Sequence, residues 1–290
     1  MKKRVSLLCI PAIVAGLLLP AVAQATVLYA LKHYTNGLFK IDTATLTLTA
    51  VGLTGVTPAP GGGFPGLAYD PYTATLYMAG GRMDNNLYAL NQQTGAATLV
   101  GNHGMESLFG LAFDSRGNVL YGASQGIFGT GPDNLVALNT VSGAATVVGD
   151  MGRAIDGLAY DSKRDELVGI EPGAGDLYAI NRNSAIVSLL YDGEFVDNSG
   201  LTYDVTEDLY WGIDFRGNLF SHDPNKGYAR TIHLTGLAEF TGLTAVVPEP
   251  ETLFLLVFGI AGLVFARRAT APGWHRGHAV LASGHSRSSV

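Results

Sequence analysis

The sequence predicts an all-β protein, a five-bladed β-propeller closed by strands from both ends of the domain. A phrase of glycine, leucine, a small residue, an aromatic and aspartate recurs along the chain. Its four complete copies and one truncated copy occupy residues 66–70, 110–114, 157–161, 200–204 and 242–246. The successive glycines are 44, 47, 43 and 42 residues apart. A period of about 40–45 residues is typical of propeller blades, and 38 glycines with only 14% charged residues fit short strands joined by tight turns.

Each period contains four short stretches of strand-forming residues, separated by turn residues such as Asp70-Pro71 and Thr94-Gly95. In the first complete period we expect strands at 66–70, 74–79, 86–91 and 96–101. The next periods repeat the pattern, with second to fourth strands expected at 119–123, 134–139, 144–149, 166–170, 176–181, 185–190, 208–213, 217–223 and 228–234.

The two ends of the repeat region complement each other. Residues 27–31, 37–42 and 45–52 match a second, third and fourth strand, but no first strand precedes them. The truncated copy at 242–246 supplies that strand from the other end, so residues 26–247 would form a closed ring of five blades. The alternative, an open stack of hairpins, would leave an unpaired edge exposed to aggregation.

The repeated phrase itself has a structural interpretation. Glycine permits close backbone approach near the propeller axis, and the leucines would pack between blades. These leucines are Leu67, Leu111, Leu158, Leu201 and Leu243. The aspartates Asp70, Asp114, Asp161 and Asp204 would begin the next turn by accepting hydrogen bonds from amides two residues on. A row of catalytic or calcium-binding carboxylates is the alternative, but turn chemistry alone accounts for the repetition.

Residues 1–25 have the properties of a secretory signal peptide. Lys2, Lys3 and Arg4 precede an apolar run over 5–19, and small residues follow at 21–25. The alternative is a retained membrane anchor. The only cysteine, Cys9, lies in this segment. The mature domain is therefore expected to contain no thiol, disulfide or cysteine metal site.

The composition changes abruptly after Val246. Val247-Pro248-Glu249-Pro250 is followed by an uncharged apolar run at 252–266 and then by Arg267-Arg268. The run is shorter than the roughly 20 residues of a typical span. We nevertheless expect a transmembrane helix over 252–266, with the arginines on the cytoplasmic side and the propeller outside. The alternative, a buried core helix, has no place in a ring that is already closed.

This arrangement over residues 247–268 resembles the PEP-CTERM sorting signal, whose parts here are Val247, Pro248, Glu249, Pro250, Arg267 and Arg268. The resemblance implies recognition by an exosortase, a membrane-embedded cysteine transpeptidase, and cleavage near residues 248–250. It also implies a bacterium that makes exopolysaccharide or biofilm matrix. One departure is a tail of 22 residues, 269–290, where such signals usually end within a few residues of the basic cluster. We expect this tail to be cytoplasmic or disordered.

Composition and motifs exclude several function classes. Residues 26–251 carry all 24 acidic residues but only 11 of the 18 basic ones, a formal charge of −13, so no nucleic-acid partner is expected. The sequence contains no nucleophile elbow, phosphate-binding loop, zinc-protease motif or calcium loop. The four histidines of the domain, His33, His103, His222 and His233, are expected to be surface residues. No cofactor or metal site is assigned.

The candidate binding site lies on the loops that lead from the fourth strand of one blade into the first strand of the next. These loops carry Glu106, Asp156, Asp197 and Glu239, together with Phe109, Phe195 and Phe240. Propeller geometry should gather them around the mouth of the channel, where carboxylates could hold a cation or contact sugar hydroxyls. The alternative is a solvated acidic rim.

These observations favour an exported, non-catalytic protein of the cell surface or extracellular matrix. Its expected partners are an exosortase, the membrane through the C-terminal helix, and exopolysaccharide or other matrix components. The alternative is a polysaccharide hydrolase or lyase, which needs two close carboxylates whose pKa values differ. A purely structural matrix protein is a third hypothesis.

Overall fold

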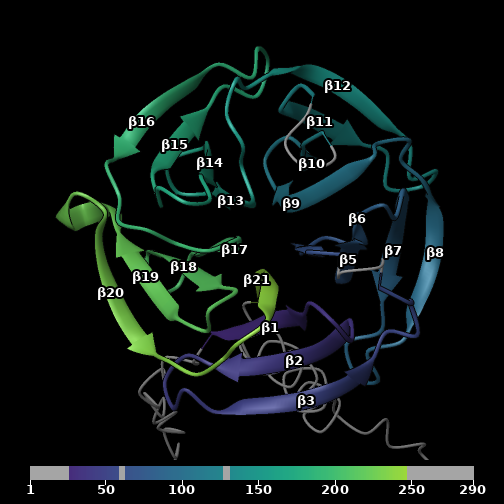
Figure 1. Cartoon of the computed structure of the whole chain (residues 1–290), viewed down its shortest axis with the longest axis horizontal. Helices are drawn as coiled ribbons and strands as arrows, with labels where there is room; N and C mark the ends of the chain where they lie inside the picture. Colours follow the sequence, from purple (N-terminus) through teal and green to yellow (C-terminus); the bar gives the residue numbers. More distant parts are fainter. Residues whose placement is uncertain (1–25, 59–62, 127–130, 247–290) are drawn as a thin grey trace, which may run out of the picture. The chain divides into compact units, whose positions relative to one another are not determined.

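The computed structural model describes residues 26–58, 63–126 and 131–246. Their strands form five antiparallel sheets arranged as blades around a central axis (Figure 1). A single turn of 3-10 helix, η2 (Pro224–Lys226), interrupts the strands of this described part. The predicted all-β, five-bladed propeller is therefore confirmed.

The four blades formed by consecutive strands follow the expected periods closely. Blade 2 contains β4 (Gly66–Asp70), β5 (Thr75–Ala79), β7 (Asn86–Leu90) and β8 (Ala97–Asn102). Blade 3 contains β9 (Ser107–Asp114), β10 (Val119–Ser124), β11 (Asn134–Leu138) and β12 (Ala145–Asp150). Blade 4 contains β13 (Gly157–Asp161), β14 (Glu166–Ile170), β15 (Leu177–Ile180) and β16 (Val187–Tyr191). Blade 5 contains β17 (Ser199–Asp204), β18 (Leu209–Asp214), β19 (Leu219–Asp223) and β20 (Ala229–Leu234).

Blade 1 is shared between the two ends of the domain, as the sequence predicts. It contains β1 (Val27–Lys32), β2 (Gly37–Asp42), β3 (Leu48–Leu53) and β21 (Phe240–Val246). The last strand, β21, occupies the innermost position and pairs antiparallel with β1, from Val27 opposite Val246 to Lys32 opposite Phe240. This pairing closes the ring, so neither the first nor the last blade presents an open inner edge.

Blade 3 differs from the expected four strands because it gains a fifth. The short strand β6 (Gly81–Arg82) leaves blade 2 and pairs with the beginning of β9, Gly81 opposite Leu108 and Arg82 opposite Ser107. The reason is that β9 begins three residues before its repeat glycine, Gly110. The backbone N–H and C=O groups of these additional residues are available for pairing with β6. A strand of two residues has no periodicity by which the sequence could reveal it.

Glycines at the start of the inner strands allow the blades to meet at the axis. A Cβ atom on Gly66 would lie 1.8 Å from the Phe109 carbonyl oxygen of the next blade. On Gly200 it would lie 2.4 Å from the Thr241 oxygen, and on Gly242 2.7 Å from the Pro65 oxygen. Gly110 and Gly157 make the corresponding approaches to blades 4 and 5. The ring therefore has no room for a side chain at these five positions.

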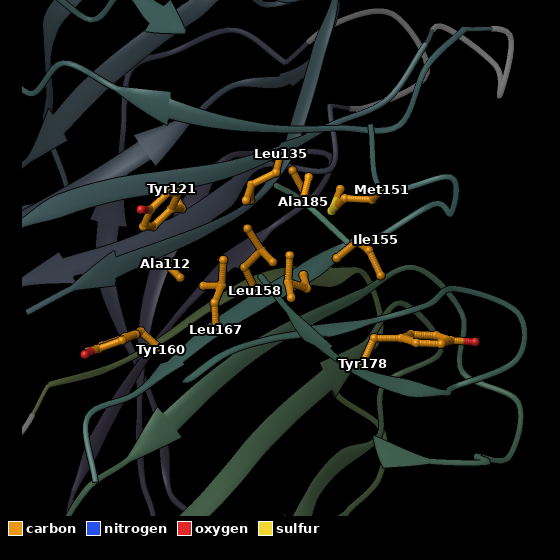
Figure 2. Packing of buried hydrophobic residues seen from close by; sticks show 12 residues of the cluster. Ala112, Tyr121, Leu135, Met151, Ile155, Leu158, Tyr160, Leu167, Tyr178 and Ala185 are labelled. Carbon is orange, nitrogen blue, oxygen red and sulfur yellow. The ribbon is translucent and has the colours of Figure 1, made fainter. Parts of the chain in front are cut away.

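The hydrophobic core is divided into five clusters, each lying between two neighbouring blades. Figure 2 shows the cluster between blades 3 and 4, where Leu135 and Ala112 of one blade face Leu158, Leu167 and Ile155 of the other. Each of the five repeat leucines lies in a different cluster and is buried. The expectation that they pack between blades is confirmed.

The repeat aspartates begin the turns from first to second strand. The Asp161 carboxylate accepts hydrogen bonds from the backbone N–H groups of Lys163 and Arg164, both at 2.8 Å. The same contact to the amide two residues on is made by the other three aspartates, Asp70, Asp114 and Asp204. Turn formation is therefore a confirmed role of the repeated acid.

These turns also connect neighbouring blades. Arg116 donates to the Ser162 carbonyl at 2.6 Å, and Arg164 donates to the Asp208 carboxylate at 2.7 Å. The Thr43 hydroxyl donates to the Glu207 carboxylate at 3.2 Å, which joins blade 1 to blade 5. Much of the acidic charge is thus placed where it holds turns and neighbouring blades together.

Several expectations lie outside the described residues. They are the signal peptide at 1–25, the sorting signal from Val247 to Arg268 with its helix at 252–266, and the tail at 269–290. Among the residues that the structure does describe, no helix is long and apolar enough to cross a membrane.

We expect Gly66→Ala to destabilise the ring strongly, by about 3 kcal/mol, because the new methyl group overlaps the Phe109 carbonyl in the neighbouring blade. Gly104→Ala is the matched control. Gly104 has a left-handed backbone (φ +75°) and no atom within 4 Å of an added Cβ, so its cost should be about 1 kcal/mol. Urea unfolding of both variants measures the difference, and equal losses would contradict the axial contact.

Candidate functional site

The ring has two faces, defined here by the direction of the inner strands. The innermost strands β4, β9, β13, β17 and β21 run in the same direction, since the residues around each repeat glycine meet the equivalent residues of the next blade. All five therefore begin on one face, the start face, and finish on the other, the end face. Because neighbouring strands are antiparallel, the start face carries two sets of loops. One set precedes the inner strands, and the other joins the second strand of each blade to the third.

Aromatic side chains from four blades meet on the start face near the axis. They form the aromatic cluster, which comprises His33, Tyr34, Phe64, Phe109 and Phe215. The ring centroids of His33 and Phe64 are 4.0 Å apart, and those of Phe64 and Phe215 are 5.8 Å apart. Tyr34 and Phe215 extend the cluster at 6.1 Å, and Phe109 continues it beyond Phe64 at 6.2 Å. Tyr34 is the most exposed member, with 51% of its surface accessible.

Phe64 occupies an unusual backbone conformation at the centre of this cluster. Its φ angle is +51°, in the left-handed region that bulky residues seldom adopt. Its N–H donates to Nδ1 of the buried His33 at 3.0 Å, so that nitrogen carries no proton and the imidazole is held in one orientation. A strained, well-supported residue of this kind is often found at ligand sites.

Arg82 and Arg216 lie over phenylalanine rings of the start face. The Arg82 guanidinium lies over Phe64 at 5.1 Å and over Phe109 at 6.0 Å. The Arg216 guanidinium lies over the half-exposed Phe195 ring at 4.4 Å. Their flat polar surfaces therefore continue the aromatic surface.

Asp156 is the buried carboxyl of the site and immediately precedes β13. Gln125 donates from Nε2 to the Asp156 Oδ1 atom at 2.8 Å and to the Ile155 carbonyl at 3.1 Å. Burial raises the pKa of Asp156 to about 7. The Gln125 hydrogen bond and the positive charge of Arg82 oppose this rise, whereas Asp197 and Asp133 reinforce it.

The other three predicted residues lie on the same face in more open positions. Asp197 forms a 3.4 Å ion pair with Arg216, and Glu239 forms a 3.3 Å ion pair with Lys32. Glu106 has an exposed side chain, and only its carbonyl is engaged, by the Met83 N–H. The structure thus brings Asp197 near enough to Asp156 to affect its pKa, but Asp156 alone is buried. A ligand-binding role for these residues stays a prediction.

A small cavity, the axial recess, lies where the aromatic cluster meets the axis. Its wall is formed by Phe64 and Asn198 together with the residue that precedes each repeat glycine: Pro65, Phe109, Asp156, Ser199 and Thr241. The cavity volume is about 10 Å³, enough for about one water-sized group. The Ser199 and Thr241 hydroxyl oxygens are buried and have no hydrogen-bond partner among the described residues.

Most residues of this recess and of the aromatic cluster were not predicted from the sequence. The residue directly before each repeat glycine could have identified the recess. In all five blades this residue lies at the same height along the axis and lines the recess. Three of the predicted acids stand three or four residues before their glycine, and only Asp156 stands directly before it.

The expectation that the histidines lie on the surface is wrong for three of them. His33, His103 and His222 are buried. Burial lowers the pKa of both His103 and His222 to about 4, so both are neutral at physiological pH. Within residues 26–58, 63–126 and 131–246, no group of three or more His, Cys, Asp or Glu side chains is placed to hold a metal ion.

We expect Asp156→Asn to stabilise the protein at pH 8, because Asn is neutral and its amide oxygen can still accept from Gln125. The folded-state pKa of Asp156, about 7, lies above its ordinary value of 3.8. The stability that Asp156 contributes is therefore full below about pH 4 and is lost as the pH rises through 7. The advantage of the variant should grow over that interval in urea unfolding. A difference that is constant from pH 4 to pH 8 would contradict the raised pKa.

The C-terminal region matches the family model of the PEP-CTERM protein-sorting motif over residues 246–269. No curated protein sequence matches the chain. The fold is similar to a chain of the nidogen/laminin complex, with a TM-score of 0.53 and 9% identity, covering 77% of this chain and 99% of that one. It is also similar to a protein of unknown function from Bacteroides thetaiotaomicron VPI-5482, with a TM-score of 0.54 and 14% identity, covering 77% of this chain and 62% of that one.

At these sequence identities the similarity to solved structures supports the fold alone. The sorting motif, in contrast, bears on the export and processing of the protein. A PEP-CTERM motif implies export, membrane anchoring before processing, and processing by an exosortase. The chain therefore consists of a five-bladed β-propeller followed by a PEP-CTERM protein-sorting motif.

Proposed function

We propose that this protein is an exported, non-catalytic binding protein that uses its start face to bind polysaccharide of the extracellular matrix. The observation that carries the proposal is the convergence of the aromatic cluster at the axis, beside the buried carboxyl of Asp156. Aromatic rings pack against the apolar faces of sugars, and a few placed polar groups bind the hydroxyls.

The electrostatics of the domain favour an uncharged or weakly charged ligand. Residues 26–251 carry a formal charge of −13, which repels polyanions at a distance. Two arginines of the start face, Arg82 and Arg216, lie over phenylalanine rings. A neutral polysaccharide matches this combination of clustered aromatic rings and scattered polar groups.

A hydrolase or lyase is the second candidate function, favoured by the pKa of about 7 at Asp156. A general acid must hold its proton near neutral pH. However, the cavity beside this carboxyl has room for only about one water-sized group. A glycosidic oxygen flanked by two sugar rings does not fit there, so binding is the function we favour. Release of reducing ends from the bound polysaccharide would reverse this preference.

The final location belongs to the same proposal. Processing by an exosortase would separate the propeller from its membrane segment, and the domain would then reside at the cell surface or in the matrix. The absence of cysteine from residues 26–251 suits such an oxidising environment.

We expect Tyr34→Ala to reduce the affinity for polysaccharide about tenfold, because Tyr34 is the most exposed ring of the aromatic cluster and a single aromatic often dominates a binding surface. Tyr72→Ala is the matched control. Tyr72 is 68% exposed but belongs to a turn on the end face. The measurement is binding to an array of bacterial exopolysaccharide fragments and neutral oligosaccharides. Equal losses in both variants would argue against the start face.

We expect the protein recovered from its host to have an intact mass that corresponds to a chain starting near residues 24–26 and ending near 248–251. Such a chain should be found in the medium or the surface fraction. Recovery only of a membrane-bound chain that still contains residues 252–290 would contradict release by an exosortase.

A further inference from the structure

We propose that the axial recess receives the exocyclic hydroxymethyl group of a hexose, so that the start face distinguishes hexose-based from pentose-based polysaccharides. This inference rests on the proposed function and specifies its substrate class. The recess residues that carry it are Asp156, Ser199 and Thr241, within a wall that also contains Phe64 and Phe109.

The recess is lined by two buried hydroxyl residues and one buried carboxyl residue. Ser199 and Thr241 are only 2% and 6% exposed, and their hydroxyl oxygens have no hydrogen-bond partner within the described part of the chain. Burying a hydroxyl without a partner is unfavourable, so two such groups at one cavity indicate a polar occupant. Gln125 engages Oδ1 of Asp156, which leaves Oδ2 outside that hydrogen bond. A hydroxyl can donate to the carboxylate and accept from a serine or threonine, which matches this set.

The small size of the recess limits which chemical groups can enter it. Its volume of about 10 Å³ admits a group about the size of one water molecule. We expect the bulk of a sugar ring to keep a directly attached hydroxyl outside a recess of this size. A hydroxymethyl group extends one carbon further from the ring. Its methylene would contact the aromatic wall while its oxygen reaches the polar groups.

The recess adjoins the aromatic cluster, because the two share Phe64. Phe64 lines the recess, and its ring centroid lies 5.8 Å from that of Phe215 and 4.0 Å from that of His33. Phe64 and Asn198 are partly exposed, whereas the other five wall residues are buried. A sugar ring stacked on the cluster is therefore placed beside the partly exposed side of the recess.

We expect these polar groups to make the recess specific for hexose units over pentose units. A site built to hydrogen-bond a particular hydroxyl discriminates strongly against a ligand that lacks it, because the polar groups of the site then stay unpaired. A pentose unit has no hydroxymethyl group and would leave Ser199 and Thr241 without a partner. A hexose unit would satisfy them.

The test uses protein recovered from its host and calorimetric titration with matched hexasaccharides. Cellohexaose and xylohexaose share a β-1,4-linked backbone and differ only in the hydroxymethyl group of each sugar. Mannohexaose and laminarihexaose are included as further hexose probes. We expect a hexose probe to bind at least about tenfold more tightly than xylohexaose, as expected for a missing hydrogen-bonding group.

Variants of the two hydroxyl residues identify the recess. Ser199→Ala and Thr241→Val should each reduce hexose affinity about 3- to 10-fold and leave xylohexaose affinity unchanged. Ser107→Ala is the matched control, because Ser107 Oγ is also buried and unpartnered but does not line the recess. Thermal unfolding should show that none of the three variants is less stable than the wild type.

The outcomes separate this inference from the function on which it rests. Equal binding of hexose and pentose probes, or identical behaviour of Ser199→Ala and Ser107→Ala, would overturn the recess proposal. If Tyr34→Ala still reduced binding in that case, the proposed function would stand. Failure of the wild type to bind any oligosaccharide or exopolysaccharide fragment would overturn both.

Discussion

Backbone contact at the axis is the constraint on which this structure depends. Five inner strands converge there, and the glycine at the head of each repeat lets one blade approach the carbonyl oxygen of the next. The leucine that follows each glycine then fills the space between two blades, and the aspartate at the end of the phrase forms the next turn. One short phrase thus supplies the contact, the packing and the turn that a blade requires.

The same constraint places the candidate site. The repeat glycines carry no side chains, so the residues directly before them provide the first side chains on the start-face side of the glycine level. In this chain those residues are Asp156, Ser199 and Thr241 beside Pro65 and Phe109. The neighbouring loops are free of the repeat, and they bring Tyr34, Phe64 and Phe215 across the axis. We therefore expect the functional residues to lie outside the repeated phrase, because the residues of the phrase form the contacts, packing and turns of the ring.

Periodic features could be predicted from the sequence, because each is stated several times along the chain. The blade number, the shared blade 1 and the turn-forming aspartates all follow from the period. The axial recess could not be found in this way, because Ser199 and Thr241 are unremarkable until five blades are superimposed around one axis. Glu106 and Glu239 stand four and three residues before their repeat glycines, whereas Asp156 stands directly before its own, and the sequence does not show which of these offsets places a side chain at the axis. The burial of His33 depends on a contact with Phe64, 31 residues away, which no local pattern encodes.

The pairing of Val27 with Val246 has a consequence for the life of the protein after synthesis. Both residues lie on the end face, so the described domain begins and ends at two neighbouring positions of one sheet. A cut near residues 248–251 falls beyond the last paired residue and leaves every strand of the closing sheet in place. A chain that ended just beyond Val246 would therefore keep all five sheets of the propeller complete.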